Sequence, residues 1–261
     1  MYADERRRQI ASLTAVAGRV SVTELAERYD VTAETIRRDL AVLSAEGVIH
    51  RVHGGAVASQ AYLSAEVPLD ARYRSASGAK TAIARAALDF IPDHPEGGIF
   101  LDSGTTISML ASQLVDHPGA DDLPIVTNSL PIALELSSEG LTNVQLLGGK
   151  VRALSQAVVG DTALRSLALM TADVAFIGTN ALTVDHGLST AHAQEAAVKA
   201  AMVTNASKVV VLCDSSKLGN DYVVNFATLD DIDVLVTDAG APPSIVERFE
   251  DHGIEVVLAA P

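Results

Sequence analysis

The pattern of apolar and polar positions near the start of the chain predicts three short helices. Apolar residues recur at helical spacing within residues 3–17, which predicts a first helix. Ser21 and Glu24 have the S-x-x-E spacing of a capping box, so a second helix is expected to begin just after Ser21. Thr32 can cap a third helix over residues 33–46. Three helices this short must pack on one another to bury their apolar faces.

The third predicted helix has one apolar face and one polar face. Ile36, Leu40 and Leu43 lie within about 60° of one another around the helix axis, which defines an inward stripe. The residues expected to face outward are Glu34, Thr35, Arg37, Arg38 and Ala41. The stretch that follows alternates briefly and reverses at Gly54 and Gly55, a pair suited to the positive φ of a tight hairpin. Three helices and a ribbon predict a winged helix-turn-helix.

From Lys80 onward, short apolar runs alternate with amphipathic helical stretches. The runs expected to be strands are residues 98–102, 124–128, 144–149, 173–178, 208–214, 233–238 and 254–259. The clearest helical stretches between them are residues 107–115, 130–138, 191–205 and 243–252. This alternation predicts an α/β fold with a mostly parallel sheet that is covered on both faces. The expected domains are residues 1–58 and 80–261, joined by a linker over residues 59–79 that has some local helix at most.

The composition indicates how large a core the chain can bury and in which cellular compartment it is expected. Hydrophobic residues make up 48% of the 261 residues, which is ample for a buried core. The single cysteine, Cys213, cannot form an internal disulfide, and its surroundings predict a buried apolar side chain in a reducing compartment. No stretch is long and apolar enough for a membrane span, and the N-terminus is too charged for a signal peptide. A cytoplasmic protein without membrane contact is expected.

Charge is distributed unevenly along the chain. The formal net charge is −14, from 33 acidic and 19 basic residues. Residues 1–58 hold eight of each, and all eight basic ones are Arg, so the whole excess of negative charge lies in the remainder. An arginine-rich, neutral module on an acidic body can present a basic face to a polyanion.

The polar face of the third helix therefore predicts contact with DNA. Arg37 and Arg38 suit guanine edges and phosphates, and Glu34 or Thr35 can also touch bases. Further contacts to the DNA backbone are expected from the wing residues Arg51, His53, Gly54 and Gly55, and from Arg6, Arg7 and Arg8. The competing interpretation is a solvated helix face beside a hairpin that serves only packing.

A second candidate site follows the strand at residues 98–102. Asp102 precedes Ser103, Gly104, Thr105 and Thr106, and this loop leads directly into a helix. Backbone N–H groups at a helix start favour a phosphate. Lys217 follows a similar strand end in "CDSSKLG" and is expected to reach the same crevice at the carboxyl edge of the sheet, with Asn128 and Gly149 adding walls.

Catalysis is not expected at this crevice. Asp102 and Glu195 are the carboxylates that could serve an isomerase, but each has a structural role available. Asp102 can accept hydrogen bonds from its loop, and Glu195 can pair with Lys199 one helical turn later. The histidines His186 and His192 lack metal-ligand spacing and are expected in a surface loop, so neither a metal nor a cofactor is predicted.

Several stretches of the sequence resemble those of the DeoR family of bacterial sugar-responsive transcription repressors. The resemblance rests on "RVSVTELAERYDVTAETIRRDLAVLSAEGVIHRVHGGAV", "IFLDSGTT", "IVTNS", "LLGGKVR", "DVAFIGTNAL", "GLST", "EAAVKAAM" and "VVLCDSSKLG", and it covers nearly the whole chain. "MYADERRRQIA" with "IGTNAL" is most similar to actinobacterial members that control fructose operons. The resemblance implies operator binding by the N-terminal part and, in the C-terminal part, the fold of ribose-5-phosphate isomerase reused as a sensor. Where the isomerases carry paired aspartates, this chain has "IGTNAL" without a carboxylate, which argues against catalysis.

The resulting hypothesis is a homo-oligomeric repressor of a carbohydrate operon, with fructose the favoured sugar. Operator DNA is one expected partner, and a phosphorylated sugar such as fructose 1-phosphate is the effector that releases it. One alternative is an active sugar-phosphate isomerase with an accessory DNA-binding head. The other is a repressor that senses an unphosphorylated sugar.

Overall fold

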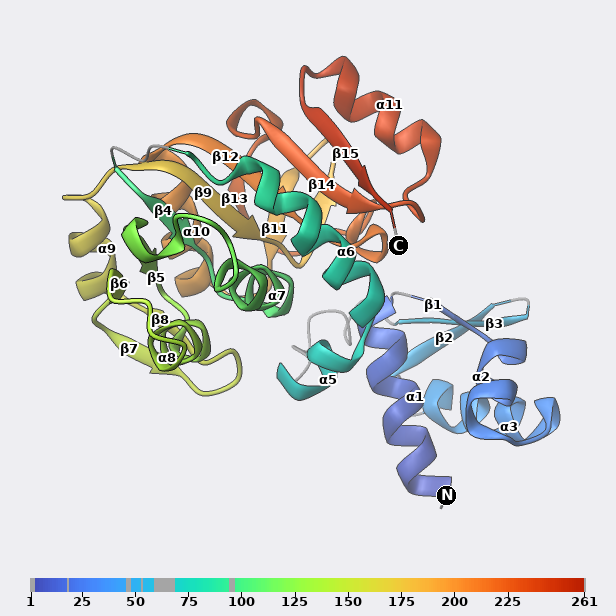
Figure 1. Cartoon of the computed structure of the whole chain (residues 1–261). Helices are drawn as coiled ribbons and strands as arrows, with labels where there is room; N and C mark the ends of the chain where they lie inside the picture. Colours follow the sequence, from blue (N-terminus) through green and yellow to red (C-terminus); the bar gives the residue numbers. More distant parts are fainter. Residues whose placement is uncertain are drawn as a thin grey trace. The chain divides into compact units, whose positions relative to one another are not determined.

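A computed structural model of the chain describes residues 3–17, 19–45, 48–52, 54–58, 69–93 and 97–260. The chain folds as two units, residues 1–75 and 76–261 (Figure 1). None of the helices described is both long enough and apolar enough to cross a bilayer.

The first unit is the expected winged helix-turn-helix. Its elements are α1 Ala3–Ala17, β1 Arg19–Ser21, α2 Val22–Tyr29, α3 Ala33–Ala45, β2 Ile49–Val52, β3 Gly55–Ala58 and α5 Leu69–Arg74. The side chain of Ser21 accepts a hydrogen bond from Glu24 N (3.1 Å), and Thr32 Oγ1 accepts one from Thr35 N (3.2 Å). These bonds satisfy backbone donors that the first turns of α2 and α3 leave unpaired, which is why the helices begin where the capping pattern predicts.

The core of this unit confirms the predicted stripe. Ile36, Leu40 and Leu43 are buried and pack in one cluster with residues of α1, α2, β2 and β3. β1 was not predicted, because three residues are too few to show an alternating pattern. It pairs with β3, so the wing is a three-stranded sheet in the order β1-β3-β2.

The second unit is built on a seven-stranded, entirely parallel sheet in the order β15-β14-β12-β9-β4-β5-β6. The strands are β4 Ile99–Leu101, β5 Ile125–Thr127, β6 Val144–Leu146, β9 Ala172–Gly178, β12 Ala206–Leu212, β14 Val234–Asp238 and β15 Glu255–Ala259. All seven coincide with the runs predicted from the sequence.

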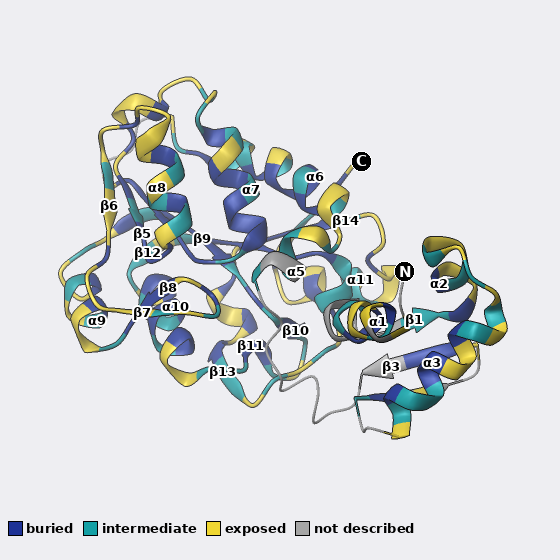
Figure 2. Cartoon of the chain, turned by 90° about the horizontal axis from the view of Figure 1, so that it is seen from below, coloured by how far each residue is buried: buried dark blue, intermediate teal, exposed yellow. Residues whose placement is uncertain are grey.

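Apolar side chains on both faces hold this sheet between two layers of helices. Along β12, Val209 and Val211 belong to one cluster of buried residues, and Val210 and Leu212 belong to another. The second cluster includes residues of α6 Ser77–Ala87, α7 Thr105–Leu114 and α8 Leu130–Ser138. The first includes α9 Asp161–Leu167, α10 Ala193–Thr204 and α11 Pro243–Asp251. Figure 2 shows the central strands as buried.

Two small antiparallel sheets complete the unit, and the sequence predicted neither. β7 Lys150–Arg152 and β8 Ala157–Val159 form a hairpin, while β10 Ala181–Thr183, β11 Gly187–Thr190 and β13 Val224–Ala227 form a three-stranded sheet. Their strands span three or four residues, and β8 and β11 are buried throughout. A short, fully buried strand shows neither an alternating pattern nor a long apolar run, so periodicity does not detect it.

Candidate functional sites

The outer face of α3 presents charged and polar side chains to solvent. Glu34, Arg37 and Arg38 are exposed and Thr35 is half-buried, and α3 carries both buried and exposed residues in Figure 2. Arg37 lies 3.5 Å from Glu34 in an exposed ion pair, which is too weak to hold the guanidinium away from another anion. These four side chains lie on the outer side of α3, and their contact with DNA stays a prediction.

The wing residues divide into one exposed cation and two glycines with different roles. Arg51 is exposed on β2. Gly54 is exposed at the hairpin tip with φ +78°, whereas Gly55 is buried in β3. A Cβ atom on Gly55 would lie 2.0 Å from Val20 O, so Gly55 is required for the pairing of β1 with β3. The positive φ expected of both glycines therefore occurs only at Gly54. His53 lies outside the described residues.

Arg6 does not serve the contact with phosphates that the sequence predicted for it. Its Nε atom donates to Asp39 Oδ2 at 2.6 Å, and both side chains are buried. This ion pair joins α1 to the inner side of α3. A buried, paired guanidinium has no surface to offer to DNA, whereas Arg8 is exposed.

The second site lies where the order of the parallel sheet reverses. The chain passes from β4 to β5 and β6 on one side, then returns to β9 and continues to β12 on the other. β4 and β9 are adjacent, and their crossover helices cover opposite faces of the sheet. The carboxyl ends of two such strands leave a crevice that binds ligands in open α/β folds.

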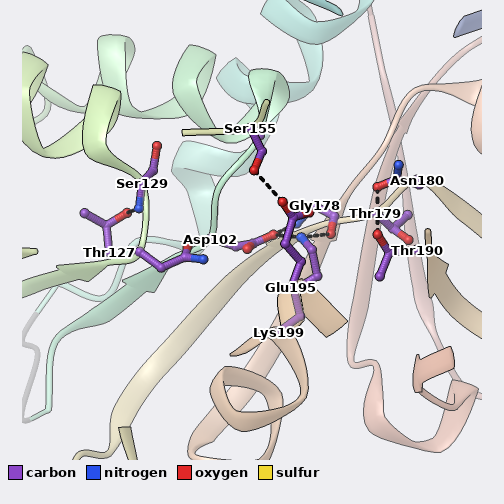
Figure 3. A network of polar contacts seen from close by, with 12 residues as sticks. Asp102, Thr127, Ser129, Ser155, Gly178, Thr179, Asn180, Thr190, Glu195 and Lys199 are labelled. Carbon is purple, nitrogen blue, oxygen red and sulfur yellow. Dashed lines mark hydrogen bonds and ion pairs between the residues drawn. The ribbon is translucent and has the colours of Figure 1, made fainter. Parts of the chain in front are cut away.

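Asp102 and Lys199 form a buried ion pair at this reversal point (Figure 3). Lys199 Nζ contacts Asp102 Oδ2 and donates to Gly178 O at 2.8 Å, while Gly178 N donates to Asp102 Oδ2 at 3.0 Å. Burial raises the pKa of Asp102 above its usual value, although the charge of Lys199 and hydrogen bonds from Lys199 and from the backbone of Gly178 and Ser103 oppose the rise. The pair therefore ties β4, β9 and α10 together at one point.

A second charged group lies one helical turn away on α10. The side chain of Glu195 accepts hydrogen bonds on Oε1 from Ser155 and from Arg152 Nη1, the latter at 3.0 Å. Burial raises the pKa of Glu195, but the bond from Ser155 and the charges of Lys199 and Arg152 outweigh it, so the pKa lies below its usual value. The predicted Glu195–Lys199 pair is thus replaced: Lys199 turns to Asp102, and Glu195 holds the β7–β8 hairpin (Figure 3).

The loop after Asp102 leads into α7 as expected. Ser103, Thr105 and Thr106 are buried, and Gly104 takes the N-cap position with φ +134°. A glycine cap has no side chain to accept from the first N–H groups of α7. The neighbouring helix α8, by contrast, is capped by Ser129, which accepts from Ile132 N at 3.4 Å. The start of α7, like that of α10, has no side-chain cap and so has amide donors to offer an anion.

The other predicted site residues lie in three different parts of the second unit. Asn128 directly follows β5, the neighbour of β4, and is buried. Gly149 begins the β7–β8 hairpin, where a Cβ atom would lie 2.8 Å from Val159 O, so it has a packing role. Lys217 lies in the 3₁₀ turn Ser215–Lys217 after β12, and β9 separates it from β4. The hydrogen bonds described join Asp102 to Lys199 rather than to Lys217.

Sequence reasoning did not assign Lys199, Arg152 or Ser155 to this site. The signal for Lys199 was available, because it is a lone charge within the small apolar stretch "AAVKAAM" of a helix whose inner face must be buried. Arg152 and Ser155 carried no comparable signal, since their hairpin was not predicted.

Comparison with known proteins gives matches over both units. The sequence matches a DeoR-like helix-turn-helix domain over residues 6–61 and a DeoR C-terminal sensor domain over residues 75–239. The HTH-type transcriptional regulator GlpR of Haloferax volcanii is 36% identical over 98% of each chain. The glycerol-3-phosphate regulon repressor of Escherichia coli is 31% identical over 99% of this chain and 100% of its own. Among solved structures, ribose 5-phosphate isomerase A from Methanocaldococcus jannaschii matches 55% of each chain with 19% identity and a TM-score of 0.40.

Proposed function

The chain belongs to the DeoR family of transcriptional regulators, and we propose that it represses a carbohydrate operon and leaves the operator when a phosphorylated sugar binds. The observation that carries the proposal is the reversal point of the sheet, where an uncapped helix start adjoins buried charges. Fructose is the favoured sugar and fructose 1-phosphate the favoured effector.

The head is proposed to read the operator through α3. Arg37 and Arg38 are exposed, and arginine is suited to guanine edges in the major groove. Arg51 on β2 is placed to hold the DNA backbone, and His53 is expected to join it. The acidic body gains nothing from contact with DNA, so binding depends on this small face.

The effector phosphate is proposed to bind the N–H groups at the start of α7, from Ser103 to Thr106. The macrodipole of a ten-residue helix adds to these donors, and the hydroxyls of the loop supply more. Lys217 is proposed to approach the phosphate from the far side of β9.

The structure supports sensing rather than catalysis at this site. A general base for sugar isomerisation works best with a pKa near the operating pH. The pKa of Glu195 is instead lowered, and its carboxylate is held by Arg152 and Ser155. One oxygen of Asp102, Oδ2, is held by Lys199 and by the Gly178 N–H.

Release is proposed to follow from a change in how copies of the chain are arranged. Helix-turn-helix dimers read half-sites about 34–36 Å apart, so a homo-oligomer with mismatched head spacing binds its operator poorly. An effector needs to favour the mismatched arrangement by only about 1–3 kcal/mol.

The test is a titration of the full chain on fluorescent operator DNA, obtained by selection from a random-sequence library. Fluorescence anisotropy is followed while fructose, fructose 1-phosphate, fructose 6-phosphate, ribose 5-phosphate or glycerol 3-phosphate is added. We expect release by at least one phosphorylated compound and none by free fructose. Release by the free sugar alone would reject the phosphate site, and conversion of ribose 5-phosphate to its ketose would reject the non-catalytic interpretation.

A further inference from the structure

Two buried oxygen atoms at the reversal point accept no hydrogen bond of good geometry from the described residues. They are Asp102 Oδ1 and Asn128 Oδ1, on side chains whose residues are 0% and 1% exposed. A buried acceptor without a donor is unfavourable, and most such atoms in proteins are paired. Both atoms are hydrogen-bond acceptors, so each of them lacks a donor.

The two residues follow neighbouring strands. Leu101 of β4 pairs with Thr127 of β5, and Asp102 and Asn128 are the next residues on these parallel strands. Neighbouring strands are about 4.8 Å apart, and successive residues alternate between the faces of a sheet. Asp102 and Asn128 therefore follow adjacent strands at the same, carboxyl edge of the sheet. Figure 3 shows Asp102 beside the segment that carries Thr127 and Ser129.

The other polar atom of each side chain already takes part in hydrogen bonds. Asp102 Oδ2 accepts from Lys199 and from Gly178 N, and Asn128 Nδ2 donates to Val158 O at 3.4 Å. Turning the Asn128 amide over would place its oxygen against the Val158 carbonyl, so the donor contact fixes which atom is free. The two free acceptors are thus oriented before any ligand arrives.

We infer that these two oxygen atoms accept hydrogen bonds from two hydroxyl groups of the effector, an inference that rests on the proposed function. An ionised phosphate has only acceptor oxygens and is repelled by Asp102, whereas a sugar hydroxyl is a donor. The phosphate then binds the start of α7, and the carbon chain lies across the ends of β4 and β5. The effector class is a phosphate ester with hydroxyls on neighbouring carbons, and Asn128 reads one of them.

The test compares Asn128→Leu with a matched control, Asn143→Leu, in the full chain. Asn143 immediately precedes β6, at the opposite, amino-terminal end of the sheet, and its amide donates to Asp121 O. The probes are fructose 1-phosphate, ribose 5-phosphate and glycerol 3-phosphate, with inorganic phosphate as the hydroxyl-free reference. Release from operator DNA is scored against each protein's own affinity for DNA, and thermal melting is recorded without ligand.

We expect Asn128→Leu to require roughly 10–100 times more of the compound that releases the wild-type protein, because a hydrogen-bonding site discriminates strongly by a missing partner. Its melting temperature without ligand should lie close to the wild-type value, since the substitution removes an unpaired buried acceptor together with the long hydrogen bond from Nδ2 to Val158 O. Asn143→Leu should respond as the wild type does. For ribose 5-phosphate, the 2-deoxy analogue should also lose potency on the wild type.

A normal response of Asn128→Leu, or equal potency of inorganic phosphate and the sugar phosphate, overturns this inference and leaves the proposed phosphate sensor standing. Failure of every phosphorylated compound to release the wild-type protein overturns the proposed function and this inference with it.

Discussion

Lys199 neutralises a carboxylate that has no contact with water, and its replacement is a sharp test of the site. The side chains of Lys199 and Asp102 are 4% and 0% exposed. Lys199→Met keeps the length of the side chain but leaves Asp102 with the Gly178 N–H as its remaining contact on Oδ2. Removing one partner of a buried ion pair costs about 3–5 kcal/mol. In a domain of this size 1 kcal/mol shifts the melting temperature by about 2–4 °C, so we expect a drop of about 6–20 °C.

The loss should depend on pH in a defined direction. Burial already raises the pKa of Asp102, and without Lys199 the folded-state pKa rises further. When the folded-state pKa of an acid lies above its unfolded value of about 3.9, the folded state is destabilised progressively as pH rises from the unfolded to the folded pKa, and the penalty disappears as pH falls back to about 3.9. Calorimetry of both proteins from pH 8 to 5.5 should show their difference narrowing on acidification, by up to about 1.4 kcal/mol per pH unit.

The control removes both charges at once. Asp102→Asn combined with Lys199→Met keeps an oxygen for the Gly178 N–H, so it should recover most of the lost stability. Three results would refute the reasoning: a loss below about 1 kcal/mol for Lys199→Met, a loss that is independent of pH, or a double variant as unstable as the single one.

Other predictions concern single residues of the two units. Arg38→Ala should weaken operator binding by about 1–3 kcal/mol in anisotropy titrations, and an unchanged affinity would exclude α3 as the reading helix. Lys217→Ala should blunt release by the phosphorylated sugar, and a normal release curve would remove it from the site. Because the pKa of Glu195 is lowered, it stabilises the fold above the usual glutamate pKa, and this contribution is lost as pH falls through the lowered value. Thermal melts of Glu195→Gln should therefore converge on the wild type in acid. Gly55→Ala should destabilise the head by about 1–3 kcal/mol in urea unfolding, since the new Cβ meets Val20 O.

Much of the fold was predictable because its signals are local. The caps at Ser21 and Thr32 and the stripe of Ile36, Leu40 and Leu43 depend on residues within one or two helical turns. The inner parallel strands are largely buried on both faces, whereas the edge strands β6 and β15 are partly exposed, and each of the seven appears as a short, mainly apolar run. The β7–β8 hairpin and the β10-β11-β13 sheet lacked such signals, because their strands are short and two of them, β8 and β11, are buried throughout.

The candidate site was predictable only in part, for a related reason. "FLDSGTT" identifies a strand end that leads into a helix, so the loop from Asp102 to Thr106 could be found from the sequence. The spacing of Glu195 and Lys199 equally permits a pair on one helix, and this prediction was wrong. Which carboxylate Lys199 meets depends on the rotation of α10 against the ends of β4 and β9.

The sequence by itself determined the helices of the head, the seven parallel strands and the family, because periodicity and motifs are properties of neighbouring residues. Only the tertiary structure decided which residues meet. Asp102 and Lys199 are 97 positions apart, and they are joined because the reversal of strand order places β4 beside β9. Burial of an unpaired carboxylate costs more free energy than partial exposure does, so the buried Asp102 needs a cationic partner more than a partly exposed carboxylate would. Partner choice in this protein is thus set by burial at the reversal point, and linear spacing does not encode it.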